Sequence, residues 1–219
     1  MKLLKWVLSR IARVLYAKEW QHLLREVRRV SLELENVPKA YRPPCVLQAM
    51  LVTGEDHRFY SHFGIDFIAV CRAIWRTVVC GRREGASTIE MQLVRVLTGR
   101  YERILSRKIR EAFLAVLLSG AIPKSDISRY YLYVAYYGTW MQGFTRAIKK
   151  LGIKVCEMNM TQAASLAARL KYPEPRRMSD KRRSQINVRT DYLVARYDVY
   201  SKSEPIRHQL VRQESRATI

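Results

Sequence analysis

The sequence predicts an all-α fold, because apolar residues recur at helical spacing along most of the 219-residue chain. Apolar residues make up 48% of the chain, which is enough to build a buried core in a protein of this length. Alternation of apolar and polar residues, the pattern of half-buried strands, is scarce. We therefore expect a mostly helical protein.

Start and stop signals place the individual helices. A first helix, which can be broken, covers 3–35 and ends before Pro38. Further helices are expected from Pro44 to Gly54, over 67–79 with a stop at Gly81, from about Thr88, over 106–119 with an end at Gly120, and at about 124–137, 161–170 and 180–200. Glu55 then lies on a turn just after a helix. The pattern divides the chain into an N-terminal basic helical segment (1–40), a central domain (41–175) and a basic C-terminal helix and tail (176–219).

The charge of the chain indicates an anionic partner. Lys and Arg number 40 against 19 for Asp and Glu, which gives a formal net charge of +21. A nucleic acid, an acidic membrane surface and a phosphate-bearing substrate would all fit this excess. The four cysteines are far apart and form no CxxC pair, which argues against zinc. Cys71 and Cys80 are expected to be buried free thiols, although the sequence leaves a disulfide open.

The N-terminal segment has the pattern of a basic amphipathic helix. The chain contains no run of about 20 apolar residues, so no membrane-spanning helix is predicted, and charges interrupt any signal-peptide core. The apolar stripe consists of Leu4, Val7, Leu8, Ile11, Val14 and Leu15, and the cations largely off it are Lys2, Lys5, Arg10 and Arg13. Two interpretations stay open: the helix lies in the interface of an anionic membrane, or it packs its stripe on the domain.

Glu55 is a first candidate for chemistry. It is followed over 56–62 by a loop rich in aromatic residues and histidines. A carboxylate on such a turn is suited to general acid–base catalysis. The structural alternative is that Glu55 caps a turn or pairs with Arg58.

Glu111 is a second candidate, because it lies in line with an apolar face of the helix over 106–119. A carboxylate there is costly unless it is paired, hydrogen-bonded or functional. Arg107 and Lys108 precede it by four and three residues, so a buried ion pair is the structural alternative. The opposite face of this helix is expected to be buried through Leu105, Ile109, Ala112, Phe113, Val116 and Leu117.

The loop over 85–88 is a candidate phosphate site. It leads into a helix N-terminus, where exposed backbone N–H groups and the helix dipole favour an anion. Ser87 and Glu90 have the capping-box form, so Glu90 is expected to cap its own helix. The neighbouring cations are Arg82, Arg83 and Arg95. The alternative is a capped helix that follows a solvated loop.

Four ordered blocks of sequence resemble the family 51 glycosyltransferases, the lipid II-polymerising domains of bifunctional penicillin-binding proteins and of monofunctional transglycosylases. The blocks are residues 55–66 (EDHRFYSHFGID), 85–89 (GASTI) with Gln92, 107–111 (RKIRE), and Lys124 with Ile127, Tyr131 and Leu132. A weaker fifth block covers 163–173, so the resemblance spans roughly 45–175. Each block alone is a modest signal, whereas four in the family's order are hard to produce by chance.

The resemblance implies a mostly helical, lysozyme-like domain of two lobes that joins lipid-linked disaccharides through β-1,4 bonds, with undecaprenyl pyrophosphate leaving. Glu55 would then be the general base. Glu111 would assist the leaving pyrophosphate with Arg107, Lys108 and a divalent cation, Mg²⁺ or Mn²⁺. The other residues implied to bind substrate are Asp56, Arg58, Phe59, His62, Gly85, Ser87, Thr88, Gln92, Arg95 and Lys124.

The resemblance also implies the partners and the location. The partners would be lipid II, the growing glycan strand, an anionic membrane surface and other cell-wall synthesis proteins, and no nucleic acid. The location would be the periplasmic face of a bacterial inner membrane. Charge and the Arg-rich stretch 176–189 also favour a nucleic-acid-binding protein, but no nucleic-acid-binding motif supports it.

The sequence departs from the family's pattern at four positions. Glu90 and Met91 stand where the family has Thr-Gln, Tyr133 where it has Asn, and Trp140 where it has Gly. A bulky indole in place of that glycine is expected to reshape the wall of the cleft. These departures motivate an alternative function, a catalytically impaired relative that binds lipid II or cell-wall enzymes as a regulator or scaffold.

Overall fold

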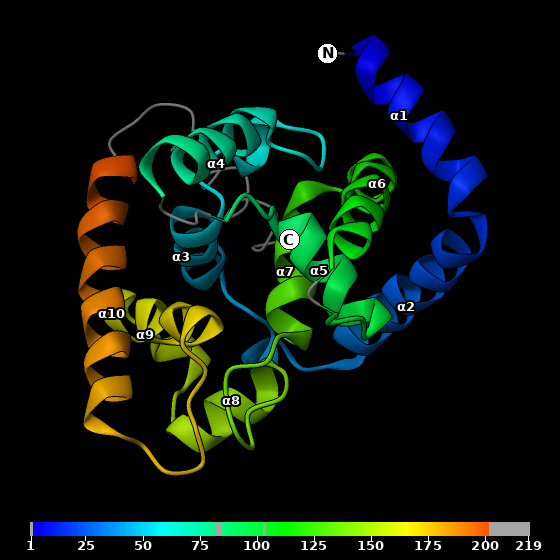
Figure 1. The fold of residues 1–219 in the computed structure, drawn as a ribbon. Coiled ribbons are helices and arrows are strands. Elements are labelled where there is room, and N and C mark those ends of the chain that lie inside the picture. Colours follow the sequence, from blue (N-terminus) through cyan, green and yellow to red (C-terminus); the bar gives the residue numbers. More distant parts are fainter. Residues whose placement is uncertain (1, 82–84, 103, 202–219) are drawn as a thin grey trace. The chain divides into compact units, whose positions relative to one another are not determined.

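The structure is a computed structural model, which describes residues 2–81, 85–102 and 104–201 (Figure 1). Its α-helices are α1 (Lys2–Leu15), α2 (Ala17–Asn36), α3 (Cys45–Glu55), α4 (Phe67–Cys80), α5 (Ile89–Thr98), α6 (Leu105–Ala121), α7 (Lys124–Val134), α8 (Phe144–Leu151), α9 (Met160–Lys171) and α10 (Asp180–Ser201). Short 3-10 helices cover Lys39–Tyr41, Phe59–Ser61 and Val155–Glu157. Within these described ranges, extended pairing is limited to two isolated bridges, Tyr136 with Gln142 and Gly138 with Glu174. The all-α prediction is confirmed.

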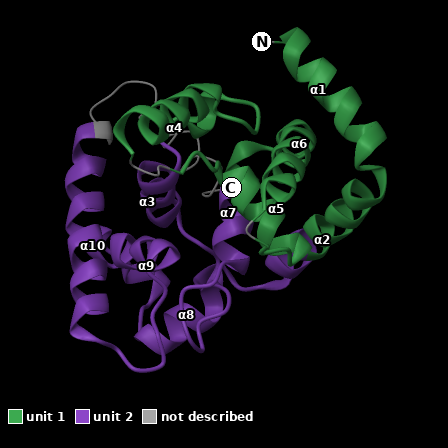
Figure 2. Cartoon of the chain, in the orientation of Figure 1, with its two compact units in different colours: residues 1–29, 58–127 green, residues 30–57, 128–219 purple. Residues whose placement is uncertain are grey.

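The chain forms two compact units, coloured separately in Figure 2. Unit 1 comprises residues 1–29 and 58–127, and unit 2 comprises residues 30–57 and 128–219. Each unit is built from two separate stretches of the chain, so residues distant in sequence come together within each unit.

Helix α6 is the central element of unit 1, where α1 and α5 pack against it. Its C-terminal half is buried all round, as its two apolar faces predict, from Leu114 to Leu118. Its N-terminal half differs from the prediction, because Leu105 and Ile109 are exposed. Helical periodicity shows which side chains share a face, but not whether another element covers that face.

Unit 2 is built on α3, α9 and α10, which pack against one another. Helix α9 is rich in alanine, and its buried alanines allow close packing. Gly54 was expected to end α3, but it lies inside that helix, where an added Cβ would come within 2.6 Å of Leu193 Cδ2 on α10. The missing side chain therefore makes room for α10. Consequently Glu55 is the last residue of α3 rather than part of a turn.

Other element boundaries differ from the sequence prediction in small ways. Thr88 rather than Ser87 caps α5, since its hydroxyl accepts from the backbone N–H of Met91. Helix α6 continues through Gly120. Helix α8 was not predicted, because its eight residues are too few for a clear period. The four cysteines are free thiols, and Cys71 and Cys80, expected to be buried, are exposed.

Helix α1 leaves most of its apolar stripe uncovered. Ala12 is its buried residue, and Tyr16 just after it packs its ring 5.8 Å from that of Phe113 on α6. Leu4, Val14 and Leu15 of the stripe are exposed. The helix therefore packs on unit 1 through a narrow face beside the stripe. Among the described residues, none of the helices has the length and apolar character to cross a membrane.

Candidate active site

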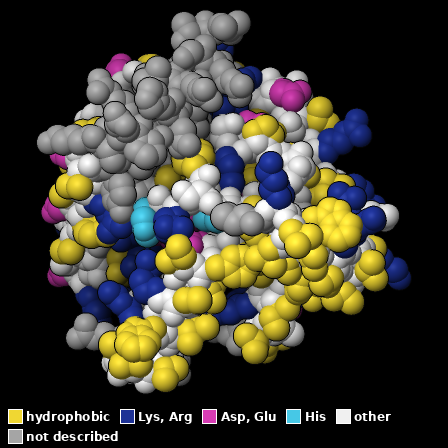
Figure 3. All heavy atoms as spheres, turned by 90° about the horizontal axis from the view of Figure 1, so that it is seen from above, with side chains coloured by type: hydrophobic (Ala, Val, Ile, Leu, Met, Phe, Trp, Pro, Cys, Tyr) yellow, Lys and Arg dark blue, Asp and Glu magenta, His cyan; other side chains and the backbone are white. Residues whose placement is uncertain are grey.

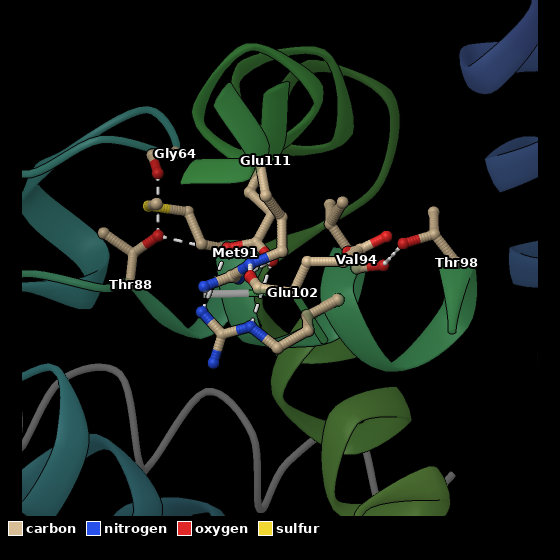
Figure 4. A network of polar contacts seen from close by, with 9 residues as sticks. Gly64, Thr88, Met91, Val94, Thr98, Glu102 and Glu111 are labelled. Carbon is tan, nitrogen blue, oxygen red and sulfur yellow. Dashed lines mark hydrogen bonds and ion pairs between the residues drawn. The ribbon is translucent and has the colours of Figure 1, made fainter. Parts of the chain in front are cut away.

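The carboxylate of Glu111 is held in unit 1 by two arginines (Figure 4). Glu111 projects from α6 and is only 2% exposed. Arg95 of α5 donates to it from Nε and from NH2, each over 3.0 Å, in a two-pronged contact. Arg107, one helical turn before Glu111, donates to the same carboxylate. Paired guanidinium contacts of this kind fix the orientation of both partners.

This cluster agrees in part with the sequence analysis. Arg107 pairs with Glu111, as their spacing of four residues predicts, and is anchored further by the carbonyl of Glu102. Lys108 instead lines a pocket. Arg95 was expected to assist a phosphate rather than to hold Glu111. The two lie 16 residues apart on different helices, and no local spacing rule links them.

The loop that carries the first sequence block is fixed to α5 and α6. Thr88 donates from its hydroxyl to the carbonyl of Gly64 over 2.8 Å. Gly64 has φ +106°, and a Cβ there would lie 2.4 Å from the carbonyl oxygen of Ala115. The Gly64 N–H donates in turn to His62 Nδ1 over 3.2 Å. Only glycine fits this close approach, so the loop has a defined position on the cluster's supporting helices.

Glu90 pairs with Lys124, which corrects the expectation that it caps its own helix. Glu90 is fully buried in the first turn of α5. The Lys124 ammonium also lies 4.4 Å from the centroid of the Phe59 ring. Lys124 was expected to contact substrate phosphates. In this structure its ammonium group contacts the Glu90 carboxylate and the face of the Phe59 ring.

Arg58, another expected substrate contact, pairs with Asp66 over 3.1 Å. Asp66 also caps α4 by accepting from the N–H groups of Ile68 and Ala69 over 3.0 and 3.1 Å. The pairing of Arg58 with Glu55 that was left open is therefore replaced by a contact that fixes the start of α4.

An apolar pocket of about 490 Å³ lies in unit 1 beside the Glu111 cluster. Helix α4 supplies one wall and the N-terminal half of α6 another. The two polar side chains that sequence analysis had assigned to substrate, Ser87 and Lys108, are part of the lining. The apolar lining includes Ile65, Val70, Ile74, Val78, Met91, Leu105 and Ile109. Leu105 and Ile109, which were expected to be buried in the core, form a wall of this pocket.

Two further residues of unit 1, Gly85 and Gln92, were expected to bind substrate. Gly85 is exposed, with open space where a Cβ would lie, and Gln92 is half-buried on α5. Arg82 and Arg83, expected beside the phosphate loop, lie outside the described residues.

Glu55 has different surroundings, in unit 2. Arg189 of α10 donates from NH2 to Glu55 Oε1 over 3.2 Å and to the carbonyl of Gly54 over 2.6 Å. Asp56 ends α3 through its backbone N–H, which donates to Val52. Sequence analysis missed Arg189, which it had placed in a basic C-terminal segment. No local signal could have found it, because 134 residues separate the two partners.

Comparison with known proteins decides the family. A sequence model described as Transglycosylase matches residues 17–198. This chain belongs to the transglycosylase family. The match includes α10, which packs on α3 and α9 and supplies Arg189 to Glu55.

Curated relatives of this transglycosylase are much longer proteins. Penicillin-binding protein 1A of Rickettsia typhi is 32% identical over 174 residues, which cover 77% of this chain and 21% of that protein. Penicillin-binding protein 1A of Aquifex aeolicus is 39% identical over 133 residues, 60% of this chain and 18% of that protein. Penicillin-binding protein 2a of Streptococcus pneumoniae strain D39 is 38% identical over 129 residues, 58% of this chain and 17% of that protein. The chain thus spans about a fifth of the length of these relatives.

The chemistry of the Glu111 cluster also bears on metal binding. Both Glu111 oxygens accept from guanidinium groups, and two nearby positive charges disfavour a divalent cation there. Elsewhere in unit 1, His62 and Glu90 are both buried and offer ligand atoms within 4.8 Å of one another. Glu90 is itself paired with the Lys124 ammonium, so a cation there would have to displace that lysine.

Proposed function

We propose that this transglycosylase polymerises lipid II into β-1,4 glycan strands with release of undecaprenyl pyrophosphate. The observation that carries the proposal is the arrangement along α6. Lys108 and Ile109 line the apolar pocket, while Arg107 and Glu111 on the same helix belong to the cationic cluster. A lipid-linked pyrophosphate has an apolar chain joined to a doubly charged group. A pocket beside a group of cations suits both parts of that molecule.

The leaving group explains why arginines surround Glu111. During transfer, the bond between the anomeric carbon of the donor and the pyrophosphate oxygen breaks, and its electron pair goes to the pyrophosphate. Arg95 and Arg107, with Lys108, would stabilise that developing charge. Glu111 would hold the two guanidinium groups in place, so that little reorganisation is needed as the charge develops.

Glu55 is proposed as the general base in the same reaction. It would take the proton of the acceptor 4-hydroxyl while that oxygen forms the new bond to the anomeric carbon. Arg189 contacts one carboxylate oxygen and the neighbouring backbone carbonyl. It would thereby restrict the rotation of the Glu55 carboxylate, whose side chain is 21% exposed and so accessible to the acceptor.

The direct test is lipid II polymerisation by the reconstituted protein. Glu55→Gln is expected to lower the rate by at least about 10²-fold, the usual contribution of a general base. Glu157→Gln is the matched control, because it makes the same change at an exposed position of the same unit. Polymerisation by Glu55→Gln at the wild-type rate would refute the assigned role. Folded wild-type protein that binds lipid II without extending it would indicate the regulator instead.

A divalent cation, Mg²⁺ or Mn²⁺, is proposed as a cofactor of this reaction. It would neutralise phosphate charge, and His62 and Glu90 would supply ligand atoms once the cation displaced Lys124 from Glu90. The polymerisation assay is repeated with chelator and with added Mg²⁺ or Mn²⁺. Loss on chelation that added cation reverses supports the proposal, and full activity in chelator contradicts it.

We also propose that α1 contacts an anionic membrane surface at the periplasmic face of an inner membrane. Helix α1 leaves most of its apolar stripe exposed and also exposes Trp6, with Arg10 5.4 Å from the Trp6 ring. The helix has basic residues at four positions and no acidic residue. Hydrophobic and basic side chains also gather on the face seen in Figure 3. Apolar side chains flanked by cations favour the interface of anionic lipid.

Vesicle binding tests this membrane contact. Wild-type protein should bind vesicles that contain anionic lipid more tightly than neutral vesicles, and added salt should weaken the binding. Val14→Glu, at an 81% exposed position, should reduce binding without affecting the fold. Equal binding of the wild type to neutral and anionic vesicles would exclude the proposal.

A further inference from the structure

Trp140 has an unusual backbone conformation. Its φ is +67°, and it is the only residue other than glycine with a positive φ among those that the structure describes. A Cβ in the left-handed region approaches the following carbonyl oxygen, so this conformation costs free energy for a bulky residue. A glycine would adopt it without that cost. Trp140 therefore has a backbone conformation that suits glycine but bears an indole.

Little of the Trp140 indole is packed against the rest of the protein. Trp140 is 73% exposed, whereas the next residue, Met141, is fully buried. The indole projects largely into solvent, so packing within unit 2 does little to offset the conformational cost. A strained and exposed aromatic residue therefore points to a contact outside the chain.

The segment around Trp140 is rigidly mounted. Thr139 donates from its N–H to the carbonyl of Glu174 over 2.7 Å, and the Glu174 N–H donates to the carbonyl of Tyr137 over 3.0 Å. Met141 donates to the carbonyl of Gly138 over 2.9 Å. An added Cβ at Gly138 would lie 2.4 Å from the Glu174 carbonyl oxygen, so the two segments are in close contact. The indole is thus presented from a fixed backbone, which lowers the entropy lost when a ligand binds.

The surroundings of the indole are polar. Lys150 donates to the carbonyl of Thr139 over 3.0 Å and pairs with Glu174 over 3.3 Å. Tyr136, on the same short hairpin, is a second exposed aromatic residue. An aromatic face beside charged and hydroxyl groups matches a sugar, whose ring has an apolar C–H face and a rim of hydroxyl and acetamido groups. A purely apolar ligand would not use these polar neighbours.

We propose that Trp140 is a saccharide-binding residue, on which a pyranose ring of the growing β-1,4 glycan strand stacks. The inference rests on the proposed function for the identity of the saccharide. The exposed indole supplies the stacking face, and the adjacent polar side chains can bind ring substituents. The site would bind the polymer at a distinct position of unit 2 and takes no part in bond formation.

The test uses soluble β-1,4-linked N-acetylglucosamine oligosaccharides as the probe. Indole N–H signals are followed by NMR during titration of the full chain. The Trp140 signal should shift saturably in the wild type, and Trp140→Gly should weaken oligosaccharide affinity at least tenfold. Trp75→Ala is the matched control, because Trp75 is similarly exposed but lies on α4 of unit 1. It should bind as the wild type does.

Two further measurements distinguish a loss of oligosaccharide binding from misfolding and from a loss of polymerisation. Trp140→Gly should have a raised Tm, since glycine removes the strain, and this excludes misfolding as the cause of lost binding. Glu55→Gln should bind the oligosaccharide like the wild type, so a failure of polymerisation does not imply a failure of this site. Unchanged oligosaccharide affinity in Trp140→Gly would overturn the proposal. So would a loss confined to binding of lipid vesicles, which would make Trp140 a membrane contact.

Discussion

Glu111 and Glu55, the two carboxylates proposed for catalysis, are held in different ways. Glu111 lies inside unit 1 with both oxygens bound by guanidinium groups of Arg95 and Arg107. Glu55 ends α3 in unit 2, where Arg189 contacts one of its oxygens. A helix C-terminus repels negative charge, and Arg189 offsets this repulsion at Glu55. The Glu111 side chain is 2% exposed and the Glu55 side chain is 21% exposed, so solvent reaches the second carboxylate more readily.

This difference matches the two proposed roles. A group that positions cations for a leaving pyrophosphate should be fixed, because its task is to hold the arginines in one orientation. A general base must exchange a proton with the acceptor, so an accessible oxygen is an advantage. The proposed difference between Glu111 and Glu55 can be tested by measuring how strongly each carboxylate contributes to folding and to catalysis.

The largest expected effect on stability is at Glu111. Glu111→Gln removes the negative charge from between Arg95 and Arg107 and leaves a buried guanidinium without its full counter-charge. The free energy of unfolding should fall by about 3–5 kcal/mol, the usual cost of breaking a buried ion pair. Urea unfolding measures it, with Glu55→Gln as the comparator. The contrast between the two sites fails if both variants lose the same stability.

A smaller effect is expected at Arg189. Arg189→Leu removes the hydrogen bonds to Glu55 and to Gly54, which should cost about 1–3 kcal/mol of stability. It should also lower kcat more than it raises KM, because Glu55 would lose its fixed orientation. A double-mutant cycle with Glu55→Gln should give a coupling energy of about 0.5–3 kcal/mol. A coupling of zero would mean that Arg189 supports the backbone of α3 alone.

The sequence predicted the helices better than it predicted which side chains on them contact one another. Periodicity alone places Glu111 on a buried face, and a spacing of four residues identifies Arg107 as its partner. Arg95 and Arg189 reach their glutamates from other helices, and tertiary packing determines such contacts. Glu90 shows the same limit, since a local rule predicted a helix cap while the fold supplied Lys124 from 34 residues away. Local rules describe one element at a time, so they cannot identify partners that folding brings together.

Gly54 and Trp140 show how a residue's role depends on its neighbours. A glycine near the end of an apolar run usually marks a helix end. At Gly54 the approach of Leu193 uses the missing side chain inside the helix instead. At Trp140 the resemblance described in the sequence analysis predicts a position that suits glycine, and the structure gives Trp140 a positive φ. The positive φ is a physical reason why glycine suits this position.

The smallest expected effect is at a third carboxylate, that of Glu174. Like Glu111, Glu174 contacts two cations, here Arg169 and Lys150. Burial would raise the pKa of Glu174, but hydrogen bonds and charge from Arg169 and Lys150 outweigh it, so the pKa lies below its ordinary value. A lowered folded-state pKa adds stability above the ordinary glutamate pKa of about 4.3, and this stability is lost as pH falls through the lower value. Glu174→Gln should therefore be less stable than the wild type at pH 7, by under about 1 kcal/mol because solvent screens the pair.

Unfolding of Glu174→Gln and wild type at a series of pH values checks this sign. The two curves should converge as pH falls from the ordinary glutamate pKa of about 4.3 through the lower folded-state pKa, because the wild-type carboxyl then becomes protonated and neutral like the amide. Glu157→Gln, an exposed change in the same unit, should follow the wild type throughout. A stability difference that persisted unchanged at low pH would show that the Arg169 contact acts through packing rather than charge. In that case two cations around a carboxylate would not by themselves indicate an electrostatic role, and the argument for Glu111 would depend on its deeper burial.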